Sequence, residues 1–94
     1  MIYNVYLIKN DLVKGTGLSL LDLKYILFYL ERIRIERQEN DSWKVIHYNR
    51  GIYKDKTPKE LFGYTNKWTK DEVFDDIDTK SLAKKLGYKI ARDL

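Results

Sequence analysis

Basic and aromatic side chains alternate between Trp43 and Lys70, and these residues are the best suited to chemistry in this 94-residue chain. Lysine and arginine neutralise phosphates while aromatic rings stack on bases, so the mixture is typical of surfaces that bind nucleic acid. We expect the contacts to come from Lys44, Tyr48, Arg50, Tyr53, Lys54, Lys56 and Trp68. The alternative is a solvated lysine-rich surface whose aromatic rings face the core. The first hypothesis is therefore a small non-enzymatic protein that binds nucleic acid, mainly by contacting the sugar-phosphate backbone of the nucleic acid.

The only histidine, His47, is the candidate general base, and Arg50 is of the type that stabilises a phosphoryl transition state. Neighbouring residues of a strand point to opposite faces, so His47 and Tyr48 would not share a site, and the second catalytic group must come from elsewhere. A weak metal-independent nuclease is accordingly only the third hypothesis, and we expect no catalytic residues. Because the chain has no cysteine and a single histidine, we also expect no cofactor and no bound metal.

Acidic residues gather between Asp71 and Asp78. Asp76 and Asp78 begin a calcium-loop pattern, but Lys80 occupies the third ligand position. We expect these carboxylates to favour a helix amino terminus, with a magnesium-binding pair as an alternative. A further alternative is that Asp75, Asp76 and Asp78 form a patch that a basic partner protein recognises. The second hypothesis is therefore a protein-interaction module, for example a phage or mobile-element inhibitor of a host or defence protein, in keeping with a residue usage typical of AT-rich coding.

One long helix is expected to position these segments. Ser19 followed by Asp22 resembles a capping box, so the helix should begin there. A first apolar stripe at helical spacing consists of Leu20, Leu23, Leu27 and Leu30. A second stripe consists of Leu21, Tyr25, Phe28 and Ile35. If the later helices leave this stripe exposed, we expect it to form a homodimer interface. We expect the helix to continue to about Arg37, although the alternation of residues 32–37 also fits a strand pairing with residues 43–48.

Strands are expected on both sides of this helix. Residues 2–8 are rich in β-branched and aromatic side chains and predict an amino-terminal strand. Gly15 and Gly17 indicate a loop between this strand and the helix, with a phosphate-binding turn as the alternative. A hairpin is expected over residues 43–54, with its turn at residues 49–51.

Shorter helices are expected after the hairpin, because capping residues occur at Thr57, Thr69 and Asp78. Gly87 should end the last of them. Residues 82–88 resemble the turn of a helix-turn-helix, yet the remaining chain is too short for a recognition helix. The tail that follows fits either a strand or a helical turn.

The composition is that of a globular protein, with 44% hydrophobic residues, 14% aromatic residues and a formal net charge of +4. Such a length supports one core, so we expect a single domain over residues 1–94. The expected fold class is α+β: a small antiparallel sheet, made of the amino-terminal strand and the hairpin over residues 43–54, packed on one long helix, with two or three short C-terminal helices. The apolar runs are too short to cross a bilayer and no secretory leader is evident, so we expect a cytoplasmic protein without membrane contact.

Overall fold

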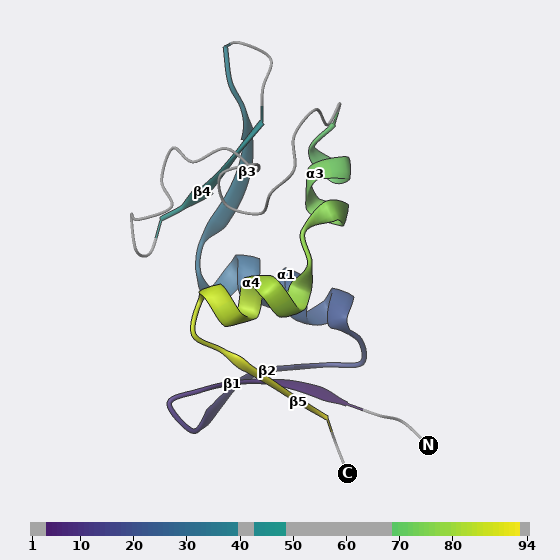
Figure 1. Ribbon diagram of the computed structural model, residues 1–94, viewed down its shortest axis with the longest axis vertical. Helices are drawn as coiled ribbons and strands as arrows, with labels where there is room; N and C mark the ends of the chain where they lie inside the picture. The colour runs from purple at the N-terminus through teal and green to yellow at the C-terminus, as the bar shows by residue number, and fades with distance from the viewer. Residues whose placement is uncertain (1–3, 40–42, 49–68, 93–94) are drawn as a thin grey trace. The chain divides into compact units, whose positions relative to one another are not determined.

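The computed structural model describes residues 4–39, 43–48 and 69–92 (Figure 1). These residues form five strands and three helices in the order β1, β2, α1, β3, β4, α3, α4 and β5, so the α+β fold class is confirmed. The chain divides into two compact units. Unit 1 consists of Met1–Leu27 and Asp78–Leu94, and unit 2 of Phe28–Ile77. The single domain expected over residues 1–94 stays a prediction.

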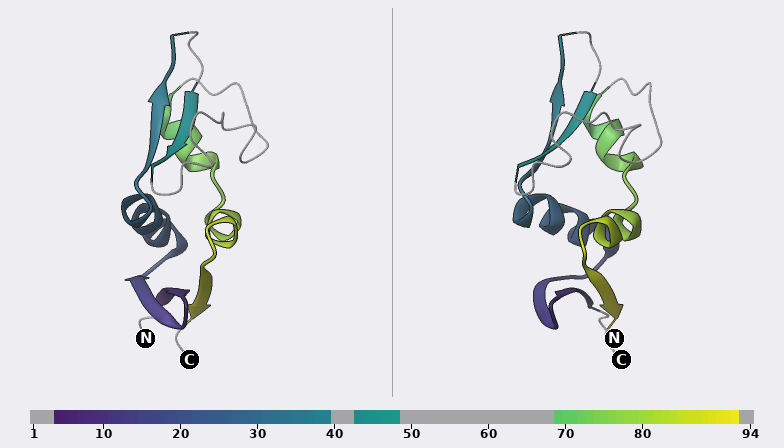
Figure 2. Two further views of the ribbon diagram at one scale, coloured as in Figure 1. Left: turned by 90° about the vertical axis from the view of Figure 1, so that its left-hand side faces the viewer. Right: turned by 60° about the vertical axis from the view of Figure 1, so that its left-hand side comes forward.

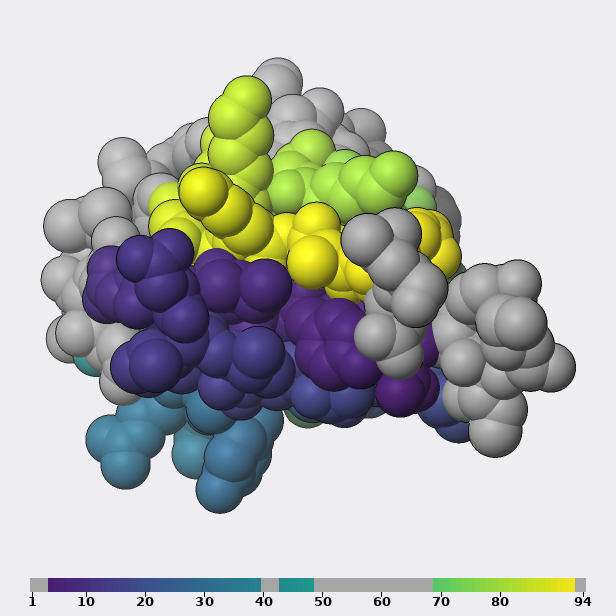
Figure 3. Space-filling view, turned by 90° about the horizontal axis from the view of Figure 1, so that it is seen from below, coloured from purple at the N-terminus to yellow at the C-terminus, as the bar shows by residue number. Residues whose placement is uncertain are grey.

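Unit 1 is built on a three-stranded antiparallel sheet with the strand order β2-β1-β5. Strand β1 (Val5–Lys9) lies between β2 (Leu12–Gly17) and β5 (Lys89–Arg92), and the purple and yellow strands are adjacent in both views of Figure 2 and in Figure 3. Asn10 and Asp11 join β1 to β2 with φ angles of 53° and 62°. This positive φ suits a two-residue hairpin turn, for which asparagine and aspartate are favoured.

The loop predicted around Gly15 and Gly17 is wrong, because both residues lie in β2. The tight turn before β2 returns the chain along β1, and this pairing outweighs the local loop signal of glycine. A Cβ atom on Gly15 would lie 2.6 Å from Cγ2 of Ile26, and one on Gly17 would lie 2.5 Å from Cβ of Asp22. The two glycines therefore allow the strand to approach helix α1 (Leu20–Leu30) closely.

Helix α1 begins as predicted. The amide of Asp22 donates to Oγ of Ser19 at 3.3 Å, and Oδ2 of Asp22 accepts from the amide of Leu18 at 2.8 Å. This reciprocal pair satisfies amides that have no partner within the helix. The buried core of unit 1 comes from β1, α1 and the segment after Asp78, and it comprises Val5, Leu7, Leu23, Leu27, Leu82, Ala83, Leu86 and Tyr88.

The predicted continuation of α1 to Arg37 is wrong, since the helix ends at Leu30. Arg32 has a φ of 54°, and the chain then continues as β3 (Ile33–Arg37). Strand β3 pairs antiparallel with β4 (Trp43–His47), and the two teal strands run side by side in Figure 2. Strands β1 and β4, which we expected in one sheet, therefore belong to two different sheets.

Burial explains why the strand forms instead of the helix. An i, i+4 pair of Arg32 with Glu36 would contribute only about 0.2–0.5 kcal/mol to a helix. As a strand, the same segment buries Ile33 and Ile35 on one face, opposite His47 and Val45 of β4. Fully burying one such aliphatic side chain contributes about 1.5–3 kcal/mol, so pairing at a distance wins over the local contact.

The two C-terminal helices are confirmed as α3 (Lys70–Asp76) and α4 (Thr79–Lys85). Both predicted caps are present: Oγ1 of Thr69 accepts from the amide of Glu72 at 3.1 Å, and Oδ2 of Asp78 accepts from the amide of Ser81 at 2.9 Å. Gly87 follows α4 with a φ of 85°, as expected for a glycine that ends a helix. Strand β5 comes directly afterwards, where a helix-turn-helix would require its second helix.

Two expected elements lie outside the described residues: the returning strand of the hairpin at residues 52–54 and the helix after Thr57. Within residues 4–39, 43–48 and 69–92, none of the helices has the length and apolar composition needed to cross a membrane.

Candidate functional site

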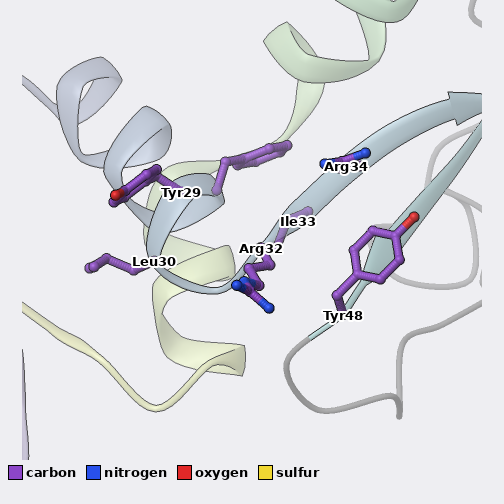
Figure 4. A pocket seen from close by; sticks show the side chains of 7 residues that line it. Tyr29, Leu30, Arg32, Ile33, Arg34 and Tyr48 are labelled. Atoms are coloured by element: carbon purple, nitrogen blue, oxygen red, sulfur yellow. The ribbon is translucent and has the colours of Figure 1, made fainter.

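Unit 2 contains a pocket of about 680 Å³. It is lined by Phe28, Tyr29, Leu30, Arg32, Ile33, Arg34 and Tyr48. Figure 4 shows Tyr29 and Leu30 on the last turn of α1 at one side, Tyr48 from the end of β4 at the other, and Arg32 between them. The volume falls within the range of about 300–1,000 Å³ that is usual for ligand sites.

The backbone places two arginines at this pocket. Arg32 occupies the turn between α1 and β3 in the left-handed conformation, which is uncommon for residues other than glycine. The carbonyl of Arg32 accepts from the amide of Tyr48 at 3.3 Å, which ties this turn to the end of β4. Because strand residues alternate, Ile33 is buried while Arg34 is exposed. Both guanidinium groups are therefore carried by the backbone that also fixes Tyr48.

The ring of Tyr48 is held in place by two side chains of β3. Its hydroxyl donates to Oε1 of Glu36 at 3.0 Å, and the guanidinium carbon of Arg34 lies 5.6 Å from the ring centroid. An arginine over a tyrosine ring gains a cation–π attraction. Tyr48 remains 46% exposed and Tyr29 is 82% exposed, so both rings are accessible to a ligand. We call Tyr29, Arg32, Arg34 and Tyr48 the arginine-tyrosine surface.

His47 lies in the interior of unit 2 and not on this surface. It is 1% exposed, and its Nε2 lies 3.2 Å from Oε1 of Glu31, which is itself 7% exposed. A buried pair of this kind links β4 to the residue that follows α1. The sequence offered no signal for Glu31, because sixteen residues separate the two partners. Arg50, the residue suggested to assist His47, lies outside the described residues.

The residues predicted to contact nucleic acid are only partly described. Tyr48 is exposed, and Lys44 is half-buried and lies opposite Glu36 in the hairpin register. Outside the described residues lie Arg50, Tyr53, Lys54, Lys56 and Trp68. Tyr29, Arg32 and Arg34 were not among the residues predicted from the sequence. Apolar and charged residues alternate over residues 32–37, which is the pattern of a strand. A strand at this position would have predicted that the two arginines lie near Tyr48.

The predicted acidic patch is divided between the two units. Asp75 and Asp76 are exposed on α3 in unit 2, whereas Asp78 caps α4 in unit 1. Hydrogen bonds from Oγ and the amide of Ser81 lower the pKa of Asp78, and the charges of Lys80 and Lys24 lower it further. Asp78 thus has a structural role. In the part of the chain that the structure describes, no three His, Asp or Glu side chains gather as a metal-binding group.

The predicted dimer stripe does not form one helical face. Leu21 and Tyr25 are exposed on α1, but Ile35 is 4% exposed and belongs to β3. The ring of Phe28 packs edge-on against Phe74 of α3, with a centroid distance of 5.0 Å. A homodimer therefore stays a prediction, and its helical face is reduced to the exposed part of α1.

Comparisons of the chain with protein-family models, with curated proteins and with solved structures gave no match.

Proposed function

We propose that this protein is a non-enzymatic binding protein that holds nucleic acid on the arginine-tyrosine surface. The observation that supports this proposal is the convergence of two exposed arginines and two exposed tyrosines at one pocket of about 680 Å³. Arginine forms paired hydrogen bonds with phosphate oxygens, and tyrosine offers a planar face for a base.

Single-stranded nucleic acid is the preferred ligand class. A base stacks on a protein ring only when the base is free of its own strand partner, and Tyr29 is 82% exposed. Tyr48 already carries Arg34 near its ring, so a phosphate bound to Arg34 would lie beside a base stacked on Tyr48. Glu36 orients the Tyr48 hydroxyl, which reduces the ordering cost of binding.

Binding to labelled single-stranded DNA, single-stranded RNA and duplex DNA, measured by fluorescence anisotropy at two salt concentrations, tests the proposal. We expect binding to single strands that weakens with salt, and weaker binding to the duplex. Absence of binding to every probe at low salt would refute the proposal.

A matched pair of tyrosine variants isolates the stacking contribution. Tyr29→Leu removes an exposed ring of the surface, whereas Tyr25→Leu removes an exposed ring of the same helix that does not line the pocket. Stacking on one ring contributes about 1–3 kcal/mol, so Tyr29→Leu should weaken binding roughly fivefold or more. Tyr25→Leu should leave it unchanged. Equal losses in the two variants would contradict a role for the pocket.

A protein-interaction module is the second proposal, and exposed apolar side chains of unit 1 favour it. Leu18 is 65% exposed, Leu21 49% and Tyr25 59%. Clustered apolar exposure marks interaction surfaces more often than isolated residues do. If this face joins two copies of the chain, light scattering should give a dimer mass that Leu21→Lys reduces to the monomer mass. A monomer at high protein concentration would oppose self-association through this face.

A further inference from the structure

A second pocket, of about 350 Å³, lies entirely within unit 1. It is lined by Leu20, Lys80, Ala83, Tyr88, Ile90 and Arg92. Most of these residues belong to α4 and β5 or to the turn between them. The two elements follow each other in the chain and are drawn in yellow-green and yellow in Figure 1. The unit 1 pocket is thus separate in sequence from the arginine-tyrosine surface and combines two cations with an apolar wall.

Regular elements carry both cations. Lys80 and Ala83 are three residues apart on α4 and therefore share a helix face. Ile90 and Arg92 lie on one face of β5, in register with buried Leu7 and Val5 of β1. This register places Arg92, which is exposed, on the same side of the sheet as buried Val5 and Leu7.

The connection between α4 and β5 is also fixed. The amide of Tyr88 donates to the carbonyl of Ala83 at 2.8 Å, and Gly87 takes the positive φ that ends the helix. The two walls of the unit 1 pocket are therefore joined by a short, hydrogen-bonded turn. The backbone that carries the two walls is therefore ordered before a ligand binds, which lowers the entropy cost of binding.

The electrostatic environment favours an anion. Unit 1 contains eight Lys and Arg against four Asp and Glu, whereas unit 2 contains ten of each, so the whole net charge of +4 belongs to unit 1. Nζ of Lys9 lies 4.8 Å from the centroid of the Tyr88 ring and adds a third cation near the pocket. The charge of Lys80 contributes to lowering the pKa of Asp78, but the carboxylate of Asp78 already accepts two hydrogen bonds from Ser81.

From this combination we infer that the unit 1 pocket binds a phosphate monoester attached to a planar or apolar body, such as a mononucleotide. Lys80 and Arg92 would bind the phosphate oxygens, because a dianion interacts with two cations more strongly than a carboxylate does. The apolar wall would receive the body of the ligand, and the volume lies in the lower part of the range for small-molecule sites. A free nucleotide and the end of an oligonucleotide both carry a phosphate of this kind. This inference does not depend on the proposed function of unit 2.

The inference is tested by titrating the isotope-labelled full chain with adenosine monophosphate, adenosine, inorganic phosphate and acetate, followed by NMR. We expect the monophosphate to shift the amides of Ala83, Tyr88 and Ile90, and to bind at least about tenfold more tightly than adenosine. Equal affinities for adenosine and its monophosphate would overturn the phosphate site. Acetate binding as tightly as inorganic phosphate would overturn the choice of phosphate over carboxylate.

Charge-matched variants locate the site. Lys80→Gln and Arg92→Gln should each weaken monophosphate binding roughly tenfold, the usual loss for a hydrogen bond to a charged group. Lys84→Gln on α4 and Lys89→Gln on β5 remove the same charge from residues that do not line the pocket, so they should have little effect. Equal losses in all four variants would show general attraction to a basic unit and overturn the site.

Two further arms identify the source of the phosphate and separate this inference from the proposed function. Oligonucleotides with and without a terminal phosphate should differ in affinity if the end of a strand occupies the unit 1 pocket, and this difference should vanish in Arg92→Gln. If only the free mononucleotide binds, the source is a free nucleotide. Arg34→Gln, in unit 2, should leave the shifts that the monophosphate causes at the amides of Ala83, Tyr88 and Ile90 unchanged, whatever it does to binding in unit 2. Loss of these three shifts in Arg34→Gln would overturn the assignment to unit 1.

Discussion

The close approach of Gly15 to α1 makes a sharp prediction about stability. In Gly15→Ala the new Cβ would lie 2.6 Å from Cγ2 of Ile26, a methyl group on a stiff β-branched side chain that has little freedom to move. Overpacking of this kind costs about 1–3 kcal/mol, whereas the lower unfolded-state entropy of alanine returns about 0.4–1 kcal/mol. The net loss should therefore be roughly 0.5–2 kcal/mol. Each kcal/mol should lower Tm by about 4–8 °C for a chain of this size.

A double-mutant cycle with Ile26→Ala isolates this contact. Ile26→Ala removes the clashing methyl group, so Gly15→Ala should be neutral or slightly stabilising in that background, with a coupling energy of about 1 kcal/mol or more. Urea denaturation followed by circular dichroism gives the four free energies of unfolding. Equal costs of Gly15→Ala in the two backgrounds would refute the packing role.

Three further predictions concern the buried pair and the helix caps. Glu31→Ala should destabilise the protein by about 1–3 kcal/mol, because it removes a buried hydrogen-bond partner of His47. Glu31→Gln keeps an oxygen at the same position and should cost less. Equal urea midpoints for the two variants would contradict this role of Glu31. Asp78→Ala should cost about 1 kcal/mol at neutral pH. Hydrogen bonds from Ser81 lower the pKa of Asp78 in the folded state, so the ionised Asp78 stabilises the fold above the ordinary pKa of 3.8, and this stabilisation is lost as the pH falls through the lower folded pKa. The difference in Tm between Asp78→Ala and wild type should therefore shrink in acid. A difference in Tm that does not change with pH would contradict the cap. Thr69→Ala should cost a similar amount and speed amide exchange in α3, and unchanged exchange would argue against this cap.

Local hydrogen-bond chemistry made the helix ends predictable. Ser19, Thr69 and Asp78 each accept a backbone amide within their own first turn, so residue type and spacing were sufficient to locate them. Gly87 ended α4 for an equally local reason, its positive φ. These features need no knowledge of the rest of the chain.

The strands missed from the sequence depend on contacts at a distance. β2 forms because Asn10 and Asp11 adopt positive φ and return the chain along β1. β3 forms because the positive φ of Arg32 ends the helical path of the chain, so that the segment after it can pair with β4. Both turns rely on uncommon φ values at residues other than glycine, which local propensity does not reveal.

The candidate site was predictable to the same extent. Tyr48 was selected because aromatic residues alternate with basic ones after Trp43, and it proves to be exposed. Arg32 and Arg34 were missed because a helical assignment removed them from the neighbourhood of Tyr48. The wrong prediction of where α1 ends is therefore also the reason that the two arginines of the candidate site were missed.

The salt dependence of single-strand binding in Arg34→Gln and Arg37→Gln tests the proposed function most directly. Both arginines are exposed on β3, but Arg34 lines the pocket while Arg37 lies 5.8 Å from the ring of Trp43. Each phosphate contact contributes about 0.7 to the slope of log affinity against log salt for single strands. We expect Arg34→Gln to reduce the slope by about that amount, and Arg37→Gln to leave it unchanged. Equal slopes for the two variants would contradict nucleic-acid binding at the arginine-tyrosine surface.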